Sequence, residues 1–231
     1  MNVTVIDYGV GNLRSLRRGL ERAGADVAVT DDRAAIADAP ALVLPGVGAF
    51  AECMRNSRPY HDLLREKAAD TPLLGICVGH QLLKTESEEV GAASETAGGR
   101  GDGPVEPVAG LDLIDGRVRR LPDDVKVPHM GWNTLAVCRD HPLVEGIDGG
   151  YAYFVHSYCS AADGRTLAGC DYGIEFAAVE AGPRGNVMGT QFHPEKSGAV
   201  GLRVLENFVG FAEAWPDVDR TDTGVGVDAA D

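Results

Sequence analysis

A cysteine between glycines is the first feature of the sequence that could carry chemistry. It stands in the segment Gly75-Ile76-Cys77-Val78-Gly79, after a short apolar run and before a stretch typical of a helix. Small neighbours allow a sharp strand-to-helix turn that leaves a nucleophile accessible, as in the G-x-S-x-G elbow of hydrolases. The N-terminus of the following helix would also lower the pKa of the thiol. The pattern fits both a nucleophile and a buried structural cysteine.

A histidine and a carboxylate stand close together far downstream, in His193-Pro194-Glu195. A carboxylate two residues after a histidine can orient the imidazole and stabilise its protonated form. Taken alone, this segment fits an ordinary histidine in a surface turn better. A nucleophilic cysteine needs a base nearby, however, so the two segments together favour a triad of Cys77, His193 and Glu195.

A glycine-rich turn, Pro45-Gly46-Val47-Gly48, follows a third apolar run. Its backbone N–H groups at Val47 and Gly48 could form one half of an oxyanion hole, and the N–H of Val78 the other half. An ordinary turn between a strand and a helix is the alternative. The segment lacks the Lys-Ser/Thr pair of a phosphate-binding P-loop, which excludes that kind of site.

The elements that must position these residues alternate between strands and helices. This order predicts one α/β domain over residues 1–214, with a central, mostly parallel sheet flanked by helices. Asn12 is a predicted N-cap of the first helix. The predicted strands cover residues 2–7, 26–30, 41–44, 72–76, 112–119, 134–138, 151–157, 166–170, 176–180 and 187–191, and the predicted helices cover 13–20, 51–69 with a break near Pro59, 78–85 and a final one from Gly198.

Two segments have no periodicity. Residues 91–109 are rich in Gly, Ala, Ser, Glu and Pro, which predicts a flexible surface loop. Residues 215–231 form an acidic, glycine-containing tail that we expect to be disordered.

The composition limits the partners and the compartment. There are 35 acidic and 21 basic residues, and the net charge of −14 disfavours nucleic acid and anionic membranes as partners. The excess of carboxylates, with four lysines, is typical of proteins adapted to salt; an acidic protein from a low-salt organism is the alternative. Without a signal peptide or an apolar run of about 20 residues, the chain is expected to be cytoplasmic. Its five cysteines form no C-x-x-C pair, so we expect no metal.

In their order along the chain, the segments PGVGAF, GICVGHQLL and QFHPEKS resemble the sequence blocks of class I glutamine amidotransferases over roughly residues 1–212. The resemblance implies the triad Cys77, His193 and Glu195, and glutamine binding by Gln81 and by Glu89. It implies no cofactor.

Four further blocks resemble one branch of that family, the glutaminase subunits of imidazole glycerol phosphate synthase. These blocks are DYGVGN, PHMGWN, YFVHSY and the KSG that follows Glu195. The resemblance implies a heterodimer with a cyclase subunit, which uses the ammonia to make imidazole glycerol phosphate and aminoimidazole carboxamide ribonucleotide in histidine biosynthesis. It places Tyr153 and Lys196 at the partner interface, near an ammonia gate. His80 departs from the branch, which usually has methionine there, and the loop 91–109 is longer than usual.

Two other classes of function remain as alternatives. One is a scaffold that has lost catalysis, against which the presence of all three triad residues argues. The other is a cysteine hydrolase of related fold that acts alone. The latter should turn over without a partner, whereas a glutaminase subunit should be nearly silent until its cyclase is added.

Overall fold

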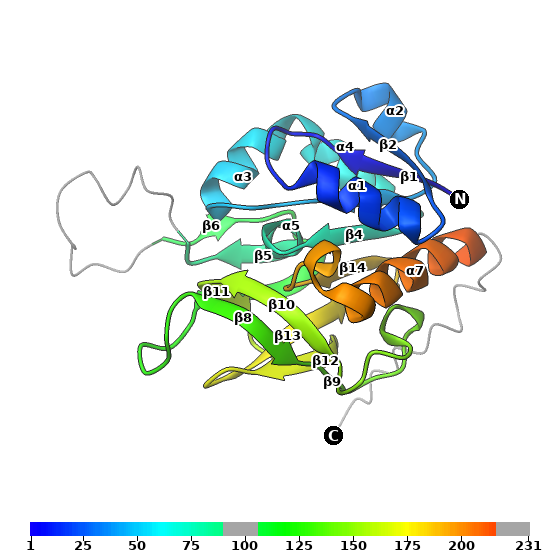
Figure 1. Ribbon diagram of the computed structural model, residues 1–231. Coiled ribbons are helices and arrows are strands. Elements are labelled where there is room, and N and C mark those ends of the chain that lie inside the picture. Colours follow the sequence, from blue (N-terminus) through cyan, green and yellow to red (C-terminus); the bar gives the residue numbers. More distant parts are fainter. Residues whose placement is uncertain (90–105, 216–231) are drawn as a thin grey trace, which may run out of the picture.

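Short apolar runs form the centre of the molecule because both of their faces are covered. Every residue of β3 (Leu42–Leu44) and β4 (Leu73–Ile76) is buried. Strands with this pattern are typical of parallel sheets between helices. Figure 1 shows the computed structural model, which describes residues 1–89 and 106–215.

Within these residues, eight strands form one sheet in the order β2-β1-β3-β4-β14-β13-β12-β9. The first five strands are parallel to one another, and the last three are added antiparallel. The predicted central, mostly parallel sheet with flanking helices is therefore confirmed. The remaining strands of this sheet are β1 (Asn2–Ile6), β2 (Asp26–Thr30), β14 (Val187–Thr190), β13 (Glu175–Ala181), β12 (Thr166–Asp171) and β9 (Ala136–Val137).

Helices cover both faces of the parallel part. The connection from β1 leads outward to β2, whereas the connection from β3 leads the other way to β4, so right-handed crossovers place their helices on opposite faces. α1 and α7 pack together on one face (Figure 1). The helices are α1 (Leu13–Arg22), α2 (Arg33–Ala37), α3 (Phe50–Ser57), α4 (His61–Lys67), α5 (Val78–Leu82) and α7 (Gly198–Ala214), with short 3-10 helices η1 (Arg58–Tyr60), η2 (Pro142–Val144) and η3 (Pro194–Lys196).

Two smaller sheets complete the fold. An antiparallel ribbon pairs β8 (His129–Thr134) with β10 (Tyr151–His156) beside η3. A four-stranded sheet has the order β11-β7-β5-β6 and consists of β11 (Tyr158–Ser160), β7 (Ile114–Arg120), β5 (Lys84–Ser87) and β6 (Val108–Ala109).

Several local predictions were wrong. The predicted helix 78–85 ends at Leu82, and the chain then forms β5. Val108 and Ala109, the end of the predicted loop 91–109, pair with β5 as β6; residues 91–105 of that loop lie outside the described residues. α1 begins at Leu13 as predicted, but the side chain of Asn12 makes no capping hydrogen bond.

The C-terminal boundary also needs a correction at one residue. Trp215, placed in the predicted tail, is buried, and its Nε1 donates a hydrogen bond of 2.9 Å to the carbonyl oxygen of Asp70. This bond and the contact of its ring with Phe211 attach it to the domain. The rest of the predicted tail, 216–231, lies outside the described residues.

Candidate active site

The backbone at Cys77 has a conformation that residues other than glycine rarely adopt. β4 ends at Ile76 and α5 begins at Val78, so Cys77 alone makes the turn, with φ 54° and ψ −111°. Such a conformation costs on the order of 1–3 kcal/mol and persists where the surrounding structure enforces it. The strained position is the one that the glycine pattern predicted as the elbow.

The two glycines beside Cys77 are required by space. A Cβ atom at Gly75 would lie 2.7 Å from the carbonyl oxygen of Gly79. A Cβ atom at Gly79 would lie 2.0 Å from the carbonyl oxygen of Leu44. Any larger residue at either position would push the backbone of the elbow away from its neighbours.

His193 connects the thiol to a carboxylate. Its Nδ1 lies 3.0 Å from Oε1 of Glu195, and both side chains are almost completely buried. Burial lowers the pKa of His193, but hydrogen bonds to Cys77 and Glu195 and the negative charges of these groups outweigh it and raise the pKa to about 9. The three predicted triad residues are therefore brought together, in the order thiol, imidazole, carboxylate.

Two more groups approach the thiol. The Sγ atom of Cys77 lies 3.9 Å from both the carbonyl oxygen of Val155 and the Nε2 of Gln191. Gln191 is fully buried, and its Oε1 accepts a hydrogen bond of 3.1 Å from Nε2 of Gln81. Gln191 was not among the predicted site residues, although its place two residues before His193 was a usable signal.

A cavity of about 310 Å³ opens at Cys77, a size suited to a small molecule. Of the predicted site residues, Glu195 lies behind His193 and Tyr153 lies outside, and the others line the cavity. Five lining residues were not predicted: Pro128, Val155, His156, Ser157 and Tyr158. The complete lining is Val47, Gly48, Cys77, Val78, Gln81, Glu89, Pro128, Val155, His156, Ser157, Tyr158, His193 and Lys196.

The two predicted glutamine-binding residues are held by the protein in different ways. Nε2 of Gln81 donates to the carbonyl oxygen of Tyr158 at 2.8 Å as well as to Gln191, so both of its N–H groups are in use. Oε2 of Glu89 accepts a hydrogen bond of 3.0 Å from the backbone N–H of Phe50, the first residue of α3. Glu89 thus places a fixed carboxylate in the cavity wall.

The predicted oxyanion turn crosses directly over the start of α5. A Cβ atom at Gly46 would lie 2.2 Å from the backbone nitrogen of Gly79. Gly48 has a φ of +91°, in the region that favours glycine, and it lines the cavity together with Val47 and Val78. The turn and the residue after Cys77 are therefore neighbours, as an oxyanion hole would require.

A second histidine in the cavity wall, His156, has both of its ring nitrogens occupied. Its Nδ1 lies 3.0 Å from the carbonyl oxygen of Tyr158, which can only accept, and its Nε2 lies 3.0 Å from Nδ1 of His129. Burial, together with the neighbouring His129, lowers the pKa of His156 to about 3, and burial lowers that of His129 to about 4. His156 is therefore neutral at pH 7, which leaves His193 as the candidate base.

His80, the residue that departs from the usual methionine, pairs with a buried carboxylate. Nε2 of His80 lies 2.5 Å from Oε1 of Glu180, and Nζ of Lys84 lies 2.7 Å from Oε2 of the same carboxylate. All three side chains are essentially inaccessible to solvent. Burial raises the pKa of Glu180, but the charges and hydrogen bonds of His80 and Lys84 outweigh it and lower the pKa to about 2. This network ties α5 to β13.

Among the described residues, no group of three or more His, Cys, Asp or Glu side chains could hold a metal ion. Across residues 1–89 and 106–215, no helix has the length and apolar character needed to cross a membrane.

Comparison with known proteins gives the same family by two routes. The family model of class-I glutamine amidotransferases matches residues 4–210. A relative from Halobacterium salinarum, named imidazole glycerol phosphate synthase subunit HisH, is 57% identical over 91% of this chain and 93% of its own length. Relatives of the same name from Natronomonas pharaonis and Methanosarcina barkeri are 55% and 47% identical over 90% of this chain, and over 94% and 97% of their own lengths.

Solved structures show the same fold at low sequence identity. A protein from Thermoplasma acidophilum, described as a putative GMP synthase subunit, superposes with a TM-score of 0.67 at 19% identity, over 94% of this chain and 96% of that protein. A structure described as a glutamine amidotransferase gives a TM-score of 0.66 at 21% identity, over 91% and 98%. With the sequence matches above, these findings show that the chain belongs to the class-I glutamine amidotransferase family, in the group of imidazole glycerol phosphate synthase HisH subunits.

Proposed function

We propose that this glutamine amidotransferase hydrolyses glutamine with Cys77 as the nucleophile and passes the ammonia to a cyclase subunit that makes imidazole glycerol phosphate. The observation that carries the chemistry is the continuous contact from Cys77 through His193 to Glu195 at the cavity wall. His193 is the cavity histidine with a raised pKa, whereas the other, His156, is held neutral.

The reaction proceeds in two halves. The Cys77 thiolate attacks the carboxamide carbon of glutamine, and N–H groups of Val78 and of the Val47–Gly48 turn stabilise the oxyanion. Protonated His193 gives its proton to the departing nitrogen, which leaves as ammonia, and a γ-glutamyl thioester remains.

Neutral His193 then takes a proton from water while the hydroxide adds to the thioester carbon. The thioester breaks to regenerate the Cys77 thiolate, and the carboxylic acid product loses its proton to bulk water. Glu195 stabilises the imidazolium form of His193. Glu89 supplies a negative charge that fits the α-ammonium group of the substrate.

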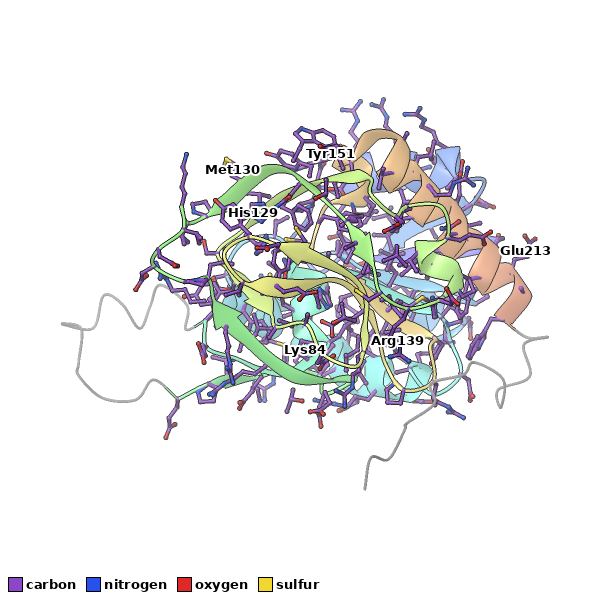
Figure 2. The ribbon with its side chains drawn as sticks, turned by 90° about the horizontal axis from the view of Figure 1, so that it is seen from below. Lys84, His129, Met130, Arg139, Tyr151 and Glu213 are labelled. Atoms are coloured by element: carbon purple, nitrogen blue, oxygen red, sulfur yellow. The ribbon has the colours of Figure 1, made fainter. Side chains whose placement is uncertain are left out.

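The outer face of the β8–β10 ribbon supports the assembly with a partner. Met130, Trp132 and Tyr151 are each more than half exposed, and Figure 2 shows Met130 and Tyr151 at the same end of the molecule. Large apolar side chains grouped on a surface are typical of protein interfaces. The ring of Tyr153 lies 5.9 Å from that of Trp132, between centroids, and belongs to the same face.

This face continues to the mouth of the cavity. Val155, opposite Met130 in the ribbon, lines the cavity, and so does Lys196, whose Nζ lies 6.0 Å from the ring centroid of Tyr153. A partner covering the ribbon would therefore lie over the cavity mouth, where Tyr153 and Lys196 could gate the passage of ammonia. Exposed Arg14 and Arg18 on α1, which packs against η3, suit an acidic region of that partner.

The test is glutamate release from glutamine, measured with and without the nucleotide ligand and the cyclase subunit. Cys77→Ala should abolish release while leaving partner binding and ammonia-dependent synthesis intact. Cys138→Ala is the matched control, because Cys138 is exposed and does not line the cavity. Retention of glutamine hydrolysis in Cys77→Ala would overturn the nucleophile, and full turnover without the cyclase would favour a hydrolase that acts alone.

The partner surface has its own test. Trp132→Ala should weaken assembly in sedimentation, with Tyr151→Ala in the same direction, and Lys196→Ala should lower the stimulation of glutaminase activity by the cyclase. A change confined to the stability of the free subunit would count against the interface. We also propose a cytoplasmic location, since free thiols such as those of Cys53, Cys159 and Cys170 persist in a reducing compartment.

A further inference from the structure

The oxyanion turn is held from behind by two buried side chains. The hydroxyl of Tyr8 donates a hydrogen bond of 2.5 Å to the carbonyl oxygen of Pro45. The thiol of Cys53, on α3, donates to the carbonyl oxygen of Val47 at 3.2 Å. Tyr8 belongs to the DYGVGN block that follows β1, a block to which the triad chemistry gives no role.

The direction of a peptide carbonyl decides the direction of the next N–H. In a planar trans peptide the two groups point opposite ways. The bond from Tyr8 to Pro45 therefore fixes the N–H of Gly46, and the bond from Cys53 to Val47 fixes the N–H of Gly48. Because Gly46 is packed against the backbone after Cys77, a small rotation of the turn would move its N–H groups relative to the nucleophile.

Both donors keep their protons at neutral pH. Tyr8 is 7% exposed and Cys53 is completely buried. Burial, with the neighbouring Cys53 and Cys77 thiols, raises the pKa of Tyr8 far above its usual range. Burial likewise raises the pKa of Cys53 to about 11. The two groups also lie within hydrogen-bonding reach of each other, so they form one buried unit behind the turn.

We propose that Tyr8 and Cys53 are positioning residues that hold the Pro45–Gly48 turn in the orientation that stabilises the oxyanion on the substrate of Cys77. This inference rests on the proposed function, since it takes Cys77 as the nucleophile. Loss of an oxyanion donor itself lowers kcat about 10²- to 10³-fold. Loss of a group that only orients the donors should lower kcat less, by about tenfold, with KM changed less than about twofold.

The experiment compares five variants of the full chain, each assembled with its cyclase subunit. Tyr8→Phe and Cys53→Ala remove one donor each, whereas Cys53→Ser keeps a donor and should retain most of the wild-type kcat. Tyr60→Phe is the matched control: Tyr60 is also a buried tyrosine whose hydroxyl donates to a backbone carbonyl, that of Asp31 at 2.9 Å, but it does not line the cavity. Cys77→Ala reports on the proposed function itself.

A second readout separates positioning from a general effect on the fold. The rate at which iodoacetamide alkylates Cys77 is measured by mass spectrometry of the peptide that contains it. This reaction forms no oxyanion. The rate of alkylation should therefore stay at the wild-type value in Tyr8→Phe and Cys53→Ala while kcat falls. Thermal melting identifies a variant that does not fold. If Tyr8→Phe or Cys53→Ala does not fold, the other of the two decides, and Cys53→Ala is then judged against Cys53→Ser.

The outcomes are distinct. An inactive Cys77→Ala together with Tyr8→Phe and Cys53→Ala that match Tyr60→Phe in kcat would overturn the positioning role and leave the proposed function intact. A parallel fall of alkylation and kcat would also overturn it, because the defect would then lie at the thiol. An active Cys77→Ala would instead overturn the proposed function.

Discussion

Replacing Lys84 by methionine should destabilise the fold by several kcal/mol, because it leaves a buried carboxylate with one partner in place of two. Lys84 and His80 are hydrogen-bonded to the two oxygens of Glu180, at 2.7 and 2.5 Å, and none of the three side chains is more than 1% exposed. Figure 2 labels Lys84. Removing one member of such a buried pair typically costs about 3–5 kcal/mol of stability. Replacing all of its charged members by uncharged residues of similar shape costs far less.

The pKa of Glu180 reflects the stabilisation of its carboxylate by His80 and Lys84 together, against the effect of burial. Its fall from 4.5 to about 2 corresponds to roughly 3 kcal/mol of preference for the ionised form in the folded state. Because the folded pKa is the lower one, this stability is present above about pH 4.5 and is lost as the pH falls toward 2. In Lys84→Met we expect a higher folded pKa of Glu180, so this stability should be smaller above pH 4.5 and should be lost over a narrower pH range.

Urea unfolding followed by circular dichroism, at one high salt concentration because of the net charge of −14, measures the effect. Glu180→Gln in the Lys84→Met background should restore at least half of the loss. Lys67→Met is the control, since Lys67 donates to the carbonyl oxygen of Ala37 and should cost only about 1 kcal/mol. A cost of Lys84→Met no larger than that of this control would refute the role of Lys84 as the partner of Glu180. So would effects of Lys84→Met and Glu180→Gln that add within about 0.5 kcal/mol.

Three further predictions concern other buried groups. Glu195→Gln should lower the pKa of His193 from about 9, as followed by NMR titration of the imidazole, and an unchanged titration would exclude the role of Glu195. Because the folded pKa is the raised one, the stability that His193 gains from Cys77 and Glu195 is full below about pH 6.5 and should vanish as the pH rises through 9. Burial lowers the pKa of His129 to about 4, so the free energy of unfolding of the wild type should fall by about 1–2 kcal/mol between pH 7 and pH 5. His129→Phe keeps the ring stacked on Tyr172 and should show a smaller fall in urea unfolding. An equal fall would contradict this cause. Trp215→Ala should lower stability by about 3–5 kcal/mol, because it removes the buried ring. Trp215→Phe should lower it by about 1 kcal/mol, because it removes only the hydrogen bond to Asp70. Equal losses in thermal melts would show that the ring packing is not what stabilises the fold.

The parallel core and the elbow could be predicted because their signals are local. β4 is a run of four buried residues, and the glycines around Cys77 stand at fixed short spacings. Each of these features needs only its own neighbours in sequence to be recognised. The same holds for α7, which begins at the predicted Gly198.

β8 and β5 could not be predicted in this way, because distant residues determine them, whereas β10 (Tyr151–His156) matches the predicted strand 151–157. The inner face of β8 carries His129, Gly131 and Asn133. The apolar Met130 and Trp132 alternate with them on the exposed face, which is the reverse of the usual strand pattern. Its histidine is buried against the rings of Tyr172 and Phe154, which come from other parts of the chain.

β5 begins with Lys84, a residue that normally argues for exposure. It is buried because Glu180, 96 residues later, accepts its hydrogen bond. The same carboxylate pairs with His80, and a methionine at that position could not make this hydrogen bond. Helical spacing continues past Leu82 in the sequence, whereas in the structure the chain leaves the helix there and pairs with β7 and β6.

The glycines of the elbow and of the Pro45–Gly48 turn have two different physical tasks. Gly46 and Gly79 leave room for the chain after β3 to cross the first turn of α5 at backbone contact, whereas Gly48 has open space around its Cβ position and is needed for its φ of +91°. The crossing makes the oxyanion turn and the elbow a single steric unit. A side chain at Gly46 or Gly79 would therefore displace the donors and the nucleophile together, while one at Gly48 would act on the donors alone. Catalytic geometry at this site depends on backbone contact, which is why spacing in the sequence was able to reveal it.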